Sequence, residues 1–192
     1  MKQIVIEAIK AHKKLLAEYE DSCVDTVVAI AEMIITSITD GGCIYICGNG
    51  GSAADAQHIA CELVGRFLKE RKAIPAIALT TDTSVLTAVG NDYCFDDVFK
   101  RQVEALVKPN DILWAFSTSG SSSNVIAAAQ MAKEKGAKVL AFTGQANTKL
   151  EDISDICLYA KAENSYSAQQ IHQLAYHTIC DLVERNFWNT SV

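Results

Sequence analysis

From Cys43 onward, short apolar runs of strand length alternate with longer stretches of helical periodicity. The apolar runs lie at 43–47, 75–80, 112–117, 138–143 and 155–160, and helix-like stretches lie near 53–69, 84–89, 95–107, 123–135, 147–153 and 166–186. Runs that are apolar at every position belong to strands buried on both faces, and alternation with helices favours parallel pairing. The pattern therefore predicts an α/β fold in which one five-stranded parallel sheet lies between two layers of helices.

Residues 1–40 precede this alternation and have a helical periodicity of their own. Apolar residues recur at Ile4, Ala8, Ala11, Leu15 and Leu16, and again at Val24, Val27, Val28, Ala31 and Ile35. Gly41 and Gly42 then end the pattern. We expect two helices that cap the domain, with an apolar stripe available for oligomerisation. Since 192 residues are about the size of one domain, we expect 1–192 to form a single domain.

The charge balance limits the partners of this chain. Its formal net charge is −6 and its pI is about 5.2. Binding the phosphates of a nucleic acid requires a basic surface, so we expect no nucleic-acid partner. A small anion held by backbone N–H groups remains compatible with this charge. The longest uninterrupted apolar runs fall well short of the roughly 20 residues that span a bilayer, so we also expect no membrane span.

Seven cysteines are spread along the chain without a Cys-x-x-Cys pair. Most lie inside apolar runs, as Cys43 and Cys47 do. A secreted protein rarely leaves so many thiols unpaired, and the first turns are charged rather than forming the apolar core of a signal peptide. We therefore expect reduced core thiols and a cytoplasmic location.

Two of the predicted strands end in loops of small residues. The first strand is followed by Gly-Asn-Gly-Gly-Ser at 48–52, and the third is followed by a loop rich in serine at 117–124. Ligands of parallel sheets bind beyond the carboxyl ends of the strands, where such loops present backbone N–H groups at helix N-termini. We predict a phosphate site, although each loop alone is also compatible with an ordinary capped turn. Neither loop matches GxGxxG with a downstream acid or GxxxxGK[ST], which disfavours a dinucleotide or a nucleoside triphosphate.

A second group of polar residues lies on two predicted helices. His58 and Glu62 are four residues apart and share one helix face, as surface i,i+4 pairs also do. The last helix carries Gln169, His172, Gln173 and His177. Imidazoles, a carboxylate and an amide oxygen could bind a divalent metal such as zinc. Gln169 and His177 are separated by a rise of about 12 Å, so a shared ion would need extended side chains, a distorted helix start or ligands from two subunits.

These motifs together resemble one known family. The stretch GNGGSAADAQH at 48–58, continued by ELVGRF at 62–67, closely resembles the sugar isomerase (SIS) domain of the phosphoheptose isomerases. GNDY at 90–93 and STSG at 117–120 match two further stretches of that family, in the same order and spacing. The chain departs from the family where Ser167-Ala168-Gln169 replaces the usual Arg-Ile-Gln, and Gln170 is a neighbouring alternative to Gln169. Cys94 stands where a glycine is common.

The resemblance implies a flavodoxin-like, three-layer SIS domain that forms a homotetramer with active sites between subunits. It implies one zinc ion per subunit, bound by His58, Glu62, Gln169 and His177, and a catalytic acid–base pair formed by Glu62 and His177. The sugar-phosphate contacts that it implies are Asn49, Gly50, Gly51, Ser52, Glu62, Asn91, Asp92, Ser117, Thr118, Ser119, Ser122 and Gln169.

The activity implied by the resemblance is the conversion of sedoheptulose 7-phosphate to D-glycero-D-manno-heptose 7-phosphate. This reaction leads to the heptose of bacterial lipopolysaccharide or related surface glycans. It proceeds through an enediol and needs a base for a carbon-bound proton and an acid for an oxygen. Two alternatives are a non-catalytic SIS module that associates with the replication initiator and an SIS isomerase of another sugar phosphate. The presence of Glu62 and His177 favours an enzyme over the first alternative.

Overall fold

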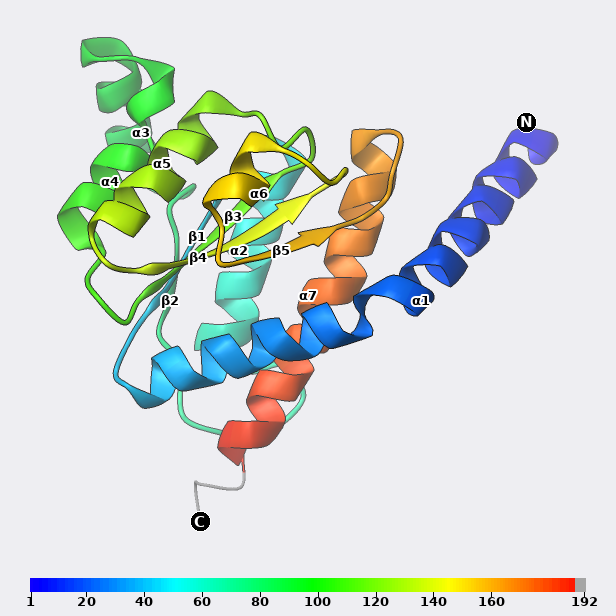
Figure 1. Cartoon of the computed structure of the whole chain (residues 1–192), viewed down its shortest axis with the longest axis horizontal. Coiled ribbons are helices and arrows are strands. Elements are labelled where there is room, and N and C mark those ends of the chain that lie inside the picture. Colours follow the sequence, from blue (N-terminus) through cyan, green and yellow to red (C-terminus); the bar gives the residue numbers. More distant parts are fainter. Residues whose placement is uncertain (189–192) are drawn as a thin grey trace.

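A five-stranded, all-parallel sheet forms the centre of the computed structural model, which describes residues 1–188 except for the side chain of Asp21. Along the sheet the order is β2-β1-β3-β4-β5 (Figure 1). The strands are β1 (Ile44–Gly48), β2 (Ala76–Ala78), β3 (Ile112–Ser117), β4 (Lys138–Thr143) and β5 (Ile156–Tyr159). Every residue of β1 and β3 is buried, as their uninterrupted apolar runs predict. The predicted five-stranded parallel sheet is confirmed.

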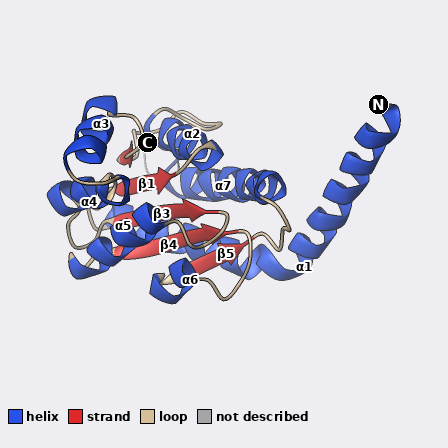
Figure 2. Ribbon diagram, turned by 90° about the horizontal axis from the view of Figure 1, so that it is seen from above, coloured by secondary structure: helices blue, strands red, loops and turns tan. Residues whose placement is uncertain are grey.

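Helices cover both faces of this sheet (Figure 2). One face packs against α1 (Lys2–Thr39), α2 (Gly51–Val64) and α7 (Ser165–Trp188). The other packs against α3 (Thr83–Asp92), α4 (Lys100–Leu106), α5 (Ser123–Glu134) and α6 (Lys149–Ile153), with a 3₁₀ turn at Phe95–Asp97. Alternation along β1 sorts its side chains between the two layers, because Ile46 faces the first group and Tyr45 faces the second. The predicted three-layer arrangement is confirmed.

The N-terminal segment forms one helix rather than the two that we expected. Helix α1 runs without interruption from Lys2 to Thr39, since the sequence places neither glycine nor proline in that interval. Its second half packs along α7, with Ile30 and Ile34 fully buried. The first ten residues of α1 are exposed. Figure 1 shows the N-terminal half of α1 projecting away from the rest of the chain.

The window Ser22–Thr39 of α1 is long and apolar enough, by length and composition, to cross a membrane. The mean hydropathy over these 18 residues is 1.6, although polar residues interrupt the apolar runs in the window. Ile30 and Ile34 of this window belong to the protein core between α1, α7 and the sheet. One such helix is weak evidence for a membrane span, and 33% of the window is buried inside this chain.

All seven cysteines are free thiols. Cys23, Cys47 and Cys180 are buried in the core, as expected, whereas Cys61 and Cys94 are exposed. Cys61 lies on the outward face of α2, and Cys94 precedes the 3₁₀ turn. The expectation of core thiols is therefore wrong for these two positions. Cys61 is exposed because residues that are neighbours in sequence do not share a helix face, and Cys94 lies in the extended residue before the 3₁₀ turn.

Candidate active site

A cavity of about 260 Å³ lies where β1 and β3 end side by side at the carboxyl edge of the sheet. We call it the loop cavity. Its lining consists of Asn49, Gly50, Gly51, Ser52, Phe116, Ser117, Thr118, Ser122, Ser165 and Gln169. Parallel pairing brings Gly48 opposite Phe116, so the loops after the two strands face each other. The two loops singled out in the sequence thus form one cavity, as predicted from the strand-end rule.

Glycine shapes the first wall of the loop cavity. Gly50 has φ of +56° and caps α2, a conformation that side chains with a Cβ rarely adopt. A Cβ at Gly51 would overlap the side-chain amide of Gln169. The absence of a side chain at position 51 therefore lets α7 bring Gln169 down onto the loop.

An amide pair joins the two walls. Asn49 follows β1, and Asn124 lies in the first turn of α5, where it is almost fully buried. Each side-chain amide nitrogen donates to the oxygen of the other, both at 2.9 Å. This reciprocal pair holds the first loop against the N-terminus of α5.

The second wall is lined with hydroxyl groups. Ser117 Oγ lies 2.9 Å from Ser122 Oγ and 3.4 Å from Ser119 Oγ, and Ser121 Oγ donates to Ser119 Oγ at 3.0 Å. None of the cavity-lining residues carries a formal charge. Helices α2 and α5 both begin at this cavity, and their N-termini carry partial positive charge. Neutral donors combined with two helix N-termini suit a phosphate group even in an acidic protein.

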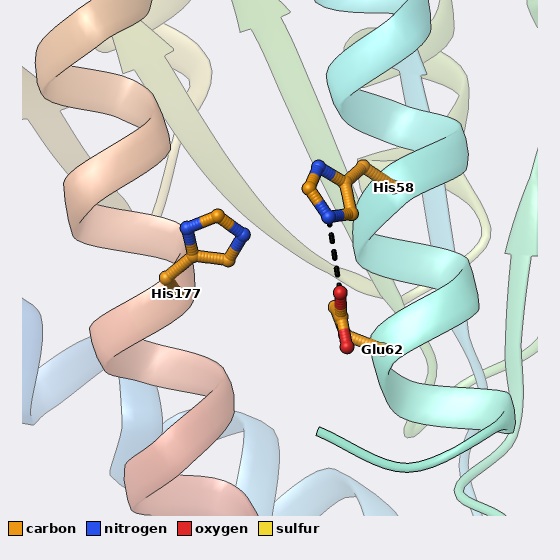
Figure 3. Close-up of side chains that lie close together, drawn as sticks. All are labelled: His58, Glu62 and His177. Atoms are coloured by element: carbon orange, nitrogen blue, oxygen red, sulfur yellow. Dashed lines mark ion pairs between the residues drawn. The ribbon is translucent and has the colours of Figure 1, made fainter. Parts of the chain in front are cut away.

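Three potential metal ligands meet between α2 and α7. His58 and Glu62 come from α2 and His177 comes from α7, and one ligand atom of each lies within 4.8 Å of the others (Figure 3). His58 Nε2 is 3.0 Å from Glu62 Oε1, and the two imidazole rings meet edge to face with centroids 4.9 Å apart. We call these residues the His–Glu cluster. The packing of α2 on α7 therefore brings these three residues together within one chain.

The environment of the His–Glu cluster is partly apolar. Phe67 stacks on His177 with ring centroids 5.7 Å apart, and burial lowers the pKa of His177. The neighbouring His58 lowers that pKa further, while Glu62 opposes the shift. His177 therefore stays neutral, as both a metal ligand and a general base require, to a lower pH than an exposed histidine.

Tyr176 and Asp55 form a hydrogen-bonded pair that contacts the His–Glu cluster through His58. The Tyr176 hydroxyl lies 3.0 Å from His58 Nδ1 and donates to Asp55 Oδ1 at 3.4 Å. Burial raises the pKa of Tyr176, so its hydroxyl keeps its proton. Burial also raises the pKa of Asp55, whereas the hydrogen bond from Tyr176 and the nearby His58 lower it.

A buried ion pair ties the ends of α2 and α7 together. Arg71 donates to the carbonyl oxygens of Glu62, Leu63 and Gly65 at the end of α2, and its Nε lies 3.4 Å from Glu184 Oε1. The Glu184 carboxylate accepts backbone N–H groups from residues 67, 68 and 69. Both charged side chains are only 1% exposed. This network sets the position of α2, which carries Glu62, against α7, which carries His177.

A scan against family models matches the SIS domain over residues 9–144. The phosphoheptose isomerase of Roseiflexus sp. (strain RS-1) is 46% identical over 184 residues, covering 96% of this chain and 93% of that protein. The structure of a phosphoheptose isomerase from Neisseria gonorrhoeae matches with a TM-score of 0.90 and 39% identity, covering 96% of this chain and 98% of that one. The structure of a phosphoheptose isomerase from Francisella tularensis matches with a TM-score of 0.92 and 33% identity, covering 95% of this chain and 97% of that one.

This chain belongs to the phosphoheptose isomerase family of SIS domains. The family assignment confirms the resemblance that the loop motifs indicated. The SIS fold also occurs in a sugar isomerase domain of an RpiR transcription factor from Sphaerobacter thermophilus, with a TM-score of 0.69. Its 18% identity shows a shared fold alone, so the family assignment rests on the closer relatives.

Three of the expected site residues lie away from the His–Glu cluster. Gln169 lines the loop cavity, two turns of α7 before His177, and Gln170 is exposed. Of these two glutamines, Gln169 is thus the one that lines the loop cavity. Asn91 and Asp92 are exposed at the end of α3, where Asn91 donates to Asp92 Oδ1 at 2.8 Å. They do not line the loop cavity of their own chain.

Several residues that build this site were not predicted from the sequence. These residues belong to no motif and act on the predicted site residues through hydrogen bonds and an ion pair. They are Asn124, Tyr176, Asp55, Arg71 and Glu184. Asn124 had a detectable signal, because it is the last residue of the serine-rich loop at 117–124, and a polar residue at that place is a common helix-start pattern. Tyr176 and Asp55 are more than a hundred residues apart, and so are Arg71 and Glu184. Only the packing of α7 on α2 brings the members of each pair together.

Proposed function

We propose that this chain converts sedoheptulose 7-phosphate to D-glycero-D-manno-heptose 7-phosphate. The observation that carries the proposal is the meeting of a carboxylate and an imidazole, Glu62 and His177, between two helices of a chain in the phosphoheptose isomerase family. A non-catalytic SIS module has no use for such a pair. The curated relatives bear the name of the isomerase, so the replication-initiator alternative is not favoured.

The reaction moves one proton between neighbouring carbons. Glu62 takes the proton from C1 of the ketose, which gives an enediol, and returns it to C2 to form the aldose. His177 passes a proton between the two oxygens, so that O1 loses a proton and O2 gains one. Both groups lie on rigid helices, which keeps them in place as the charge moves.

The loop cavity is the proposed phosphate site. The proposed contacts are Asn49 to Ser52, Ser117 to Ser119 and Ser122, with Gln169 closing the cavity from α7. The phosphate lies far from the reacting carbons of a seven-carbon sugar, so these contacts supply binding energy that orients the substrate. Asn91 and Asp92 are proposed to contact the sugar from a neighbouring subunit, since they are exposed and do not line the cavity of their own chain.

The residues of the His–Glu cluster fit a zinc ion, because two imidazoles and a carboxylate are an established donor set for catalytic zinc. We propose His58, Glu62 and His177 as ligands within one chain, with Gln169 as the fourth. In this chain the Gln169 amide lies against Gly51, so its role as a ligand needs another rotamer or a partner subunit. A bound zinc ion would polarise the substrate carbonyl, and Glu62 and His177 would still carry the protons.

A homotetramer with active sites between subunits is the proposed assembly. Helices α1 and α7 enclose an apolar groove of about 510 Å³, lined by Leu16, Tyr19, Glu20, Cys23, Val24, Val27, Val28, Leu174, Thr178 and Leu182. The projecting half of α1 adds exposed Ile4, Val5, Ile6 and Ile9. Apolar surfaces of this extent favour burial against further copies of the chain, and light scattering of the purified protein tests the number of copies.

We further propose that residues 1–192 act as one SIS domain with residues 1–40 as its cap and oligomerisation element.

A cytoplasmic location is proposed because all seven thiols are free. The product is proposed to enter the synthesis of bacterial surface heptose.

The deciding experiment is an assay of the purified protein on a panel of sugar 7-, 6- and 5-phosphates. Turnover of sedoheptulose 7-phosphate above the others supports the proposal. Preference for another sugar phosphate would identify a different SIS isomerase, and no turnover with any would favour a binding module.

Zinc is tested separately by elemental analysis of two variants. His177→Ala removes a proposed ligand, so zinc per chain should fall. His172→Gln changes a histidine on the sheet-facing side of the same helix, so zinc should stay at the wild-type level. Equal loss in both variants, or full activity of metal-free protein, would refute the zinc site and leave a metal-free acid–base pair.

A further inference from the structure

We propose that Tyr176 is a positioning residue that fixes the orientation and the tautomer of His58. Its hydroxyl group holds His58 with the proton on Nδ1 and the lone pair of Nε2 turned toward Glu62 and a bound cation. The part of this inference that concerns the cation rests on the zinc site proposed above. Tyr176 itself contacts neither substrate nor metal in this assignment.

The contacts of His58 place one partner on each ring nitrogen. Nδ1 lies 3.0 Å from the Tyr176 hydroxyl, and Nε2 lies 3.0 Å from Glu62 Oε1. The fully buried phenol ring also packs edge to face against His58 and His177, with centroids 5.6 Å and 4.6 Å away. The ring of Tyr176 therefore limits rotation of both imidazoles, and its hydroxyl selects which edge of His58 faces Glu62.

Two arrangements of the protons fit the contacts of His58. The Tyr176 hydroxyl can donate to Nδ1, which leaves Nε2–H to donate to Glu62, or it can donate to Asp55 Oδ1 and accept from Nδ1–H. A cation bound at Nε2 requires the second arrangement, because that nitrogen must then present its lone pair. Asp55 Oδ2 is buried and has no hydrogen-bond partner among the described residues.

This assignment leaves two acceptors facing each other. Nε2 without a proton and the Glu62 carboxylate are 3.0 Å apart, and His177 lies beside them. Such an arrangement is stable when a cation lies among the three groups. Metal-bound histidines usually donate their other ring N–H to a fixed acceptor, and the Tyr176–Asp55 pair supplies that acceptor here.

The first test compares Tyr176→Phe with Tyr45→Phe. Tyr45 is a buried tyrosine in the opposite core layer, and its hydroxyl donates to the carbonyl of Leu106 at 3.2 Å. Both variants lose one buried hydroxyl, but only Tyr176→Phe should weaken zinc binding, by about 10–100-fold in competition with a chelator of known affinity. Equal zinc affinities in the two variants, with wild-type affinity retained, would overturn the inference.

The second test reads the tautomer directly and does not use activity. ¹⁵N NMR of the histidine rings in zinc-loaded wild-type protein near pH 8, with His58 assigned by its loss in His58→Asn, should show the proton on Nδ1. In metal-free protein the proton should move to Nε2, where it is donated to Glu62. A zinc-loaded wild-type protein in which Nδ1 of His58 carries no proton would overturn the inference even if Tyr176→Phe does not fold. Absence of zinc binding in the wild type would refute the metal site and this inference with it, whereas zinc binding that Tyr176→Phe leaves unchanged would refute the role of Tyr176 alone.

Discussion

The loop cavity and the His–Glu cluster lie in the same protein but are built in different ways. The cavity takes most of its lining from two loops, 49–52 and 117–122, each continuous in sequence. The cluster joins two helices, and the His58–Tyr176 contact spans 118 residues. The geometry of the cavity therefore depends on local turns and on the pairing of β1 with β3, whereas that of the cluster depends on how α2 packs on α7.

The difference predicts different responses to substitution. A change in the packing of α2 on α7 should lower turnover with little effect on phosphate binding, while a change in the serine loop should do the reverse. Four experiments test this separation, starting from the largest expected effect.

Glu184→Gln should have the largest effect on stability. It leaves the buried Arg71 without its ionic partner, and breaking a buried pair in this way typically costs about 3–5 kcal/mol. We expect that loss in denaturant unfolding, together with a lower kcat and a nearly unchanged KM. Asp181→Asn is the control, since its pair with Arg185 on the same helix is far less buried and its loss should cost about 0.5 kcal/mol. Similar stabilities for both variants would contradict the role assigned to Arg71 and Glu184.

Glu62→Gln should lower kcat at least about 100-fold, equivalent to about 2.7 kcal/mol of barrier, because the proposed base is lost while the shape of the side chain remains. Steady-state kinetics on sedoheptulose 7-phosphate and an unfolding curve measure the two quantities. Glu70→Gln, in the exposed loop that follows α2, is the matched control and should be as active as the wild type. Wild-type turnover in Glu62→Gln would remove Glu62 from the mechanism.

His172 should make the protein less stable in acid. Burial lowers the pKa of His172 to about 4, while the unfolded chain has the ordinary value near 6.5. Because the unfolded state binds the proton first, the stabilisation is present above pH 6.5 and is lost as pH falls toward 4. We expect about 2 kcal/mol of loss at pH 4.5 relative to pH 7.

His172→Gln isolates this effect, since glutamine keeps a donor for the carbonyl oxygen of Thr143 but does not titrate. The difference in unfolding free energy between wild type and His172→Gln should shrink or reverse between pH 7 and pH 4.5. A difference that does not change with pH would show that His172 is not the responsible group. The result sharpens the contrast on α7 between a histidine that faces the sheet and His177 in the cluster.

Ser119→Ala and Ser122→Ala should have the smallest effect. Each removes a hydroxyl donor but leaves the backbone donors of the loop, so we expect KM to rise about tenfold, or about 1.4 kcal/mol, with kcat largely retained. Ser154→Ala is a control at the end of α6, where the hydroxyl donates to the carbonyl oxygen of Glu151. An unchanged KM in both loop variants would place the phosphate elsewhere.

The fold was predictable from the sequence because its main signals are local. Apolar runs placed all five strands within a few residues of where they lie, and helical periodicity placed most of the helices between them. Two helix predictions were wrong in part, because α2 ends at Val64 rather than near 69 and the stretch 95–107 is divided into a 3₁₀ turn and α4. The single long α1 was not anticipated, because a continuing apolar pattern does not by itself distinguish one helix from two. The exposure of Cys61 was missed for a related reason, since the helix face that is buried depends on its neighbours.

The sequence alone determined the kinds of groups available and the loops that present them. The Gly-Asn-Gly-Gly-Ser and serine-rich motifs define two strand-end turns, and the i,i+4 spacing of His58 and Glu62 puts both on one face of α2. The spacing of residues did not separate His177 from His172; the family resemblance named His177, and the packing of α7 brings it to His58 and Glu62. Tertiary structure alone decided that Gln169 lies against Gly51 and that the Tyr176 hydroxyl contacts His58. The physical reason is that residues on one helix diverge by about 100° per position, so their partners are selected by the packing of α7 against α2 and the sheet.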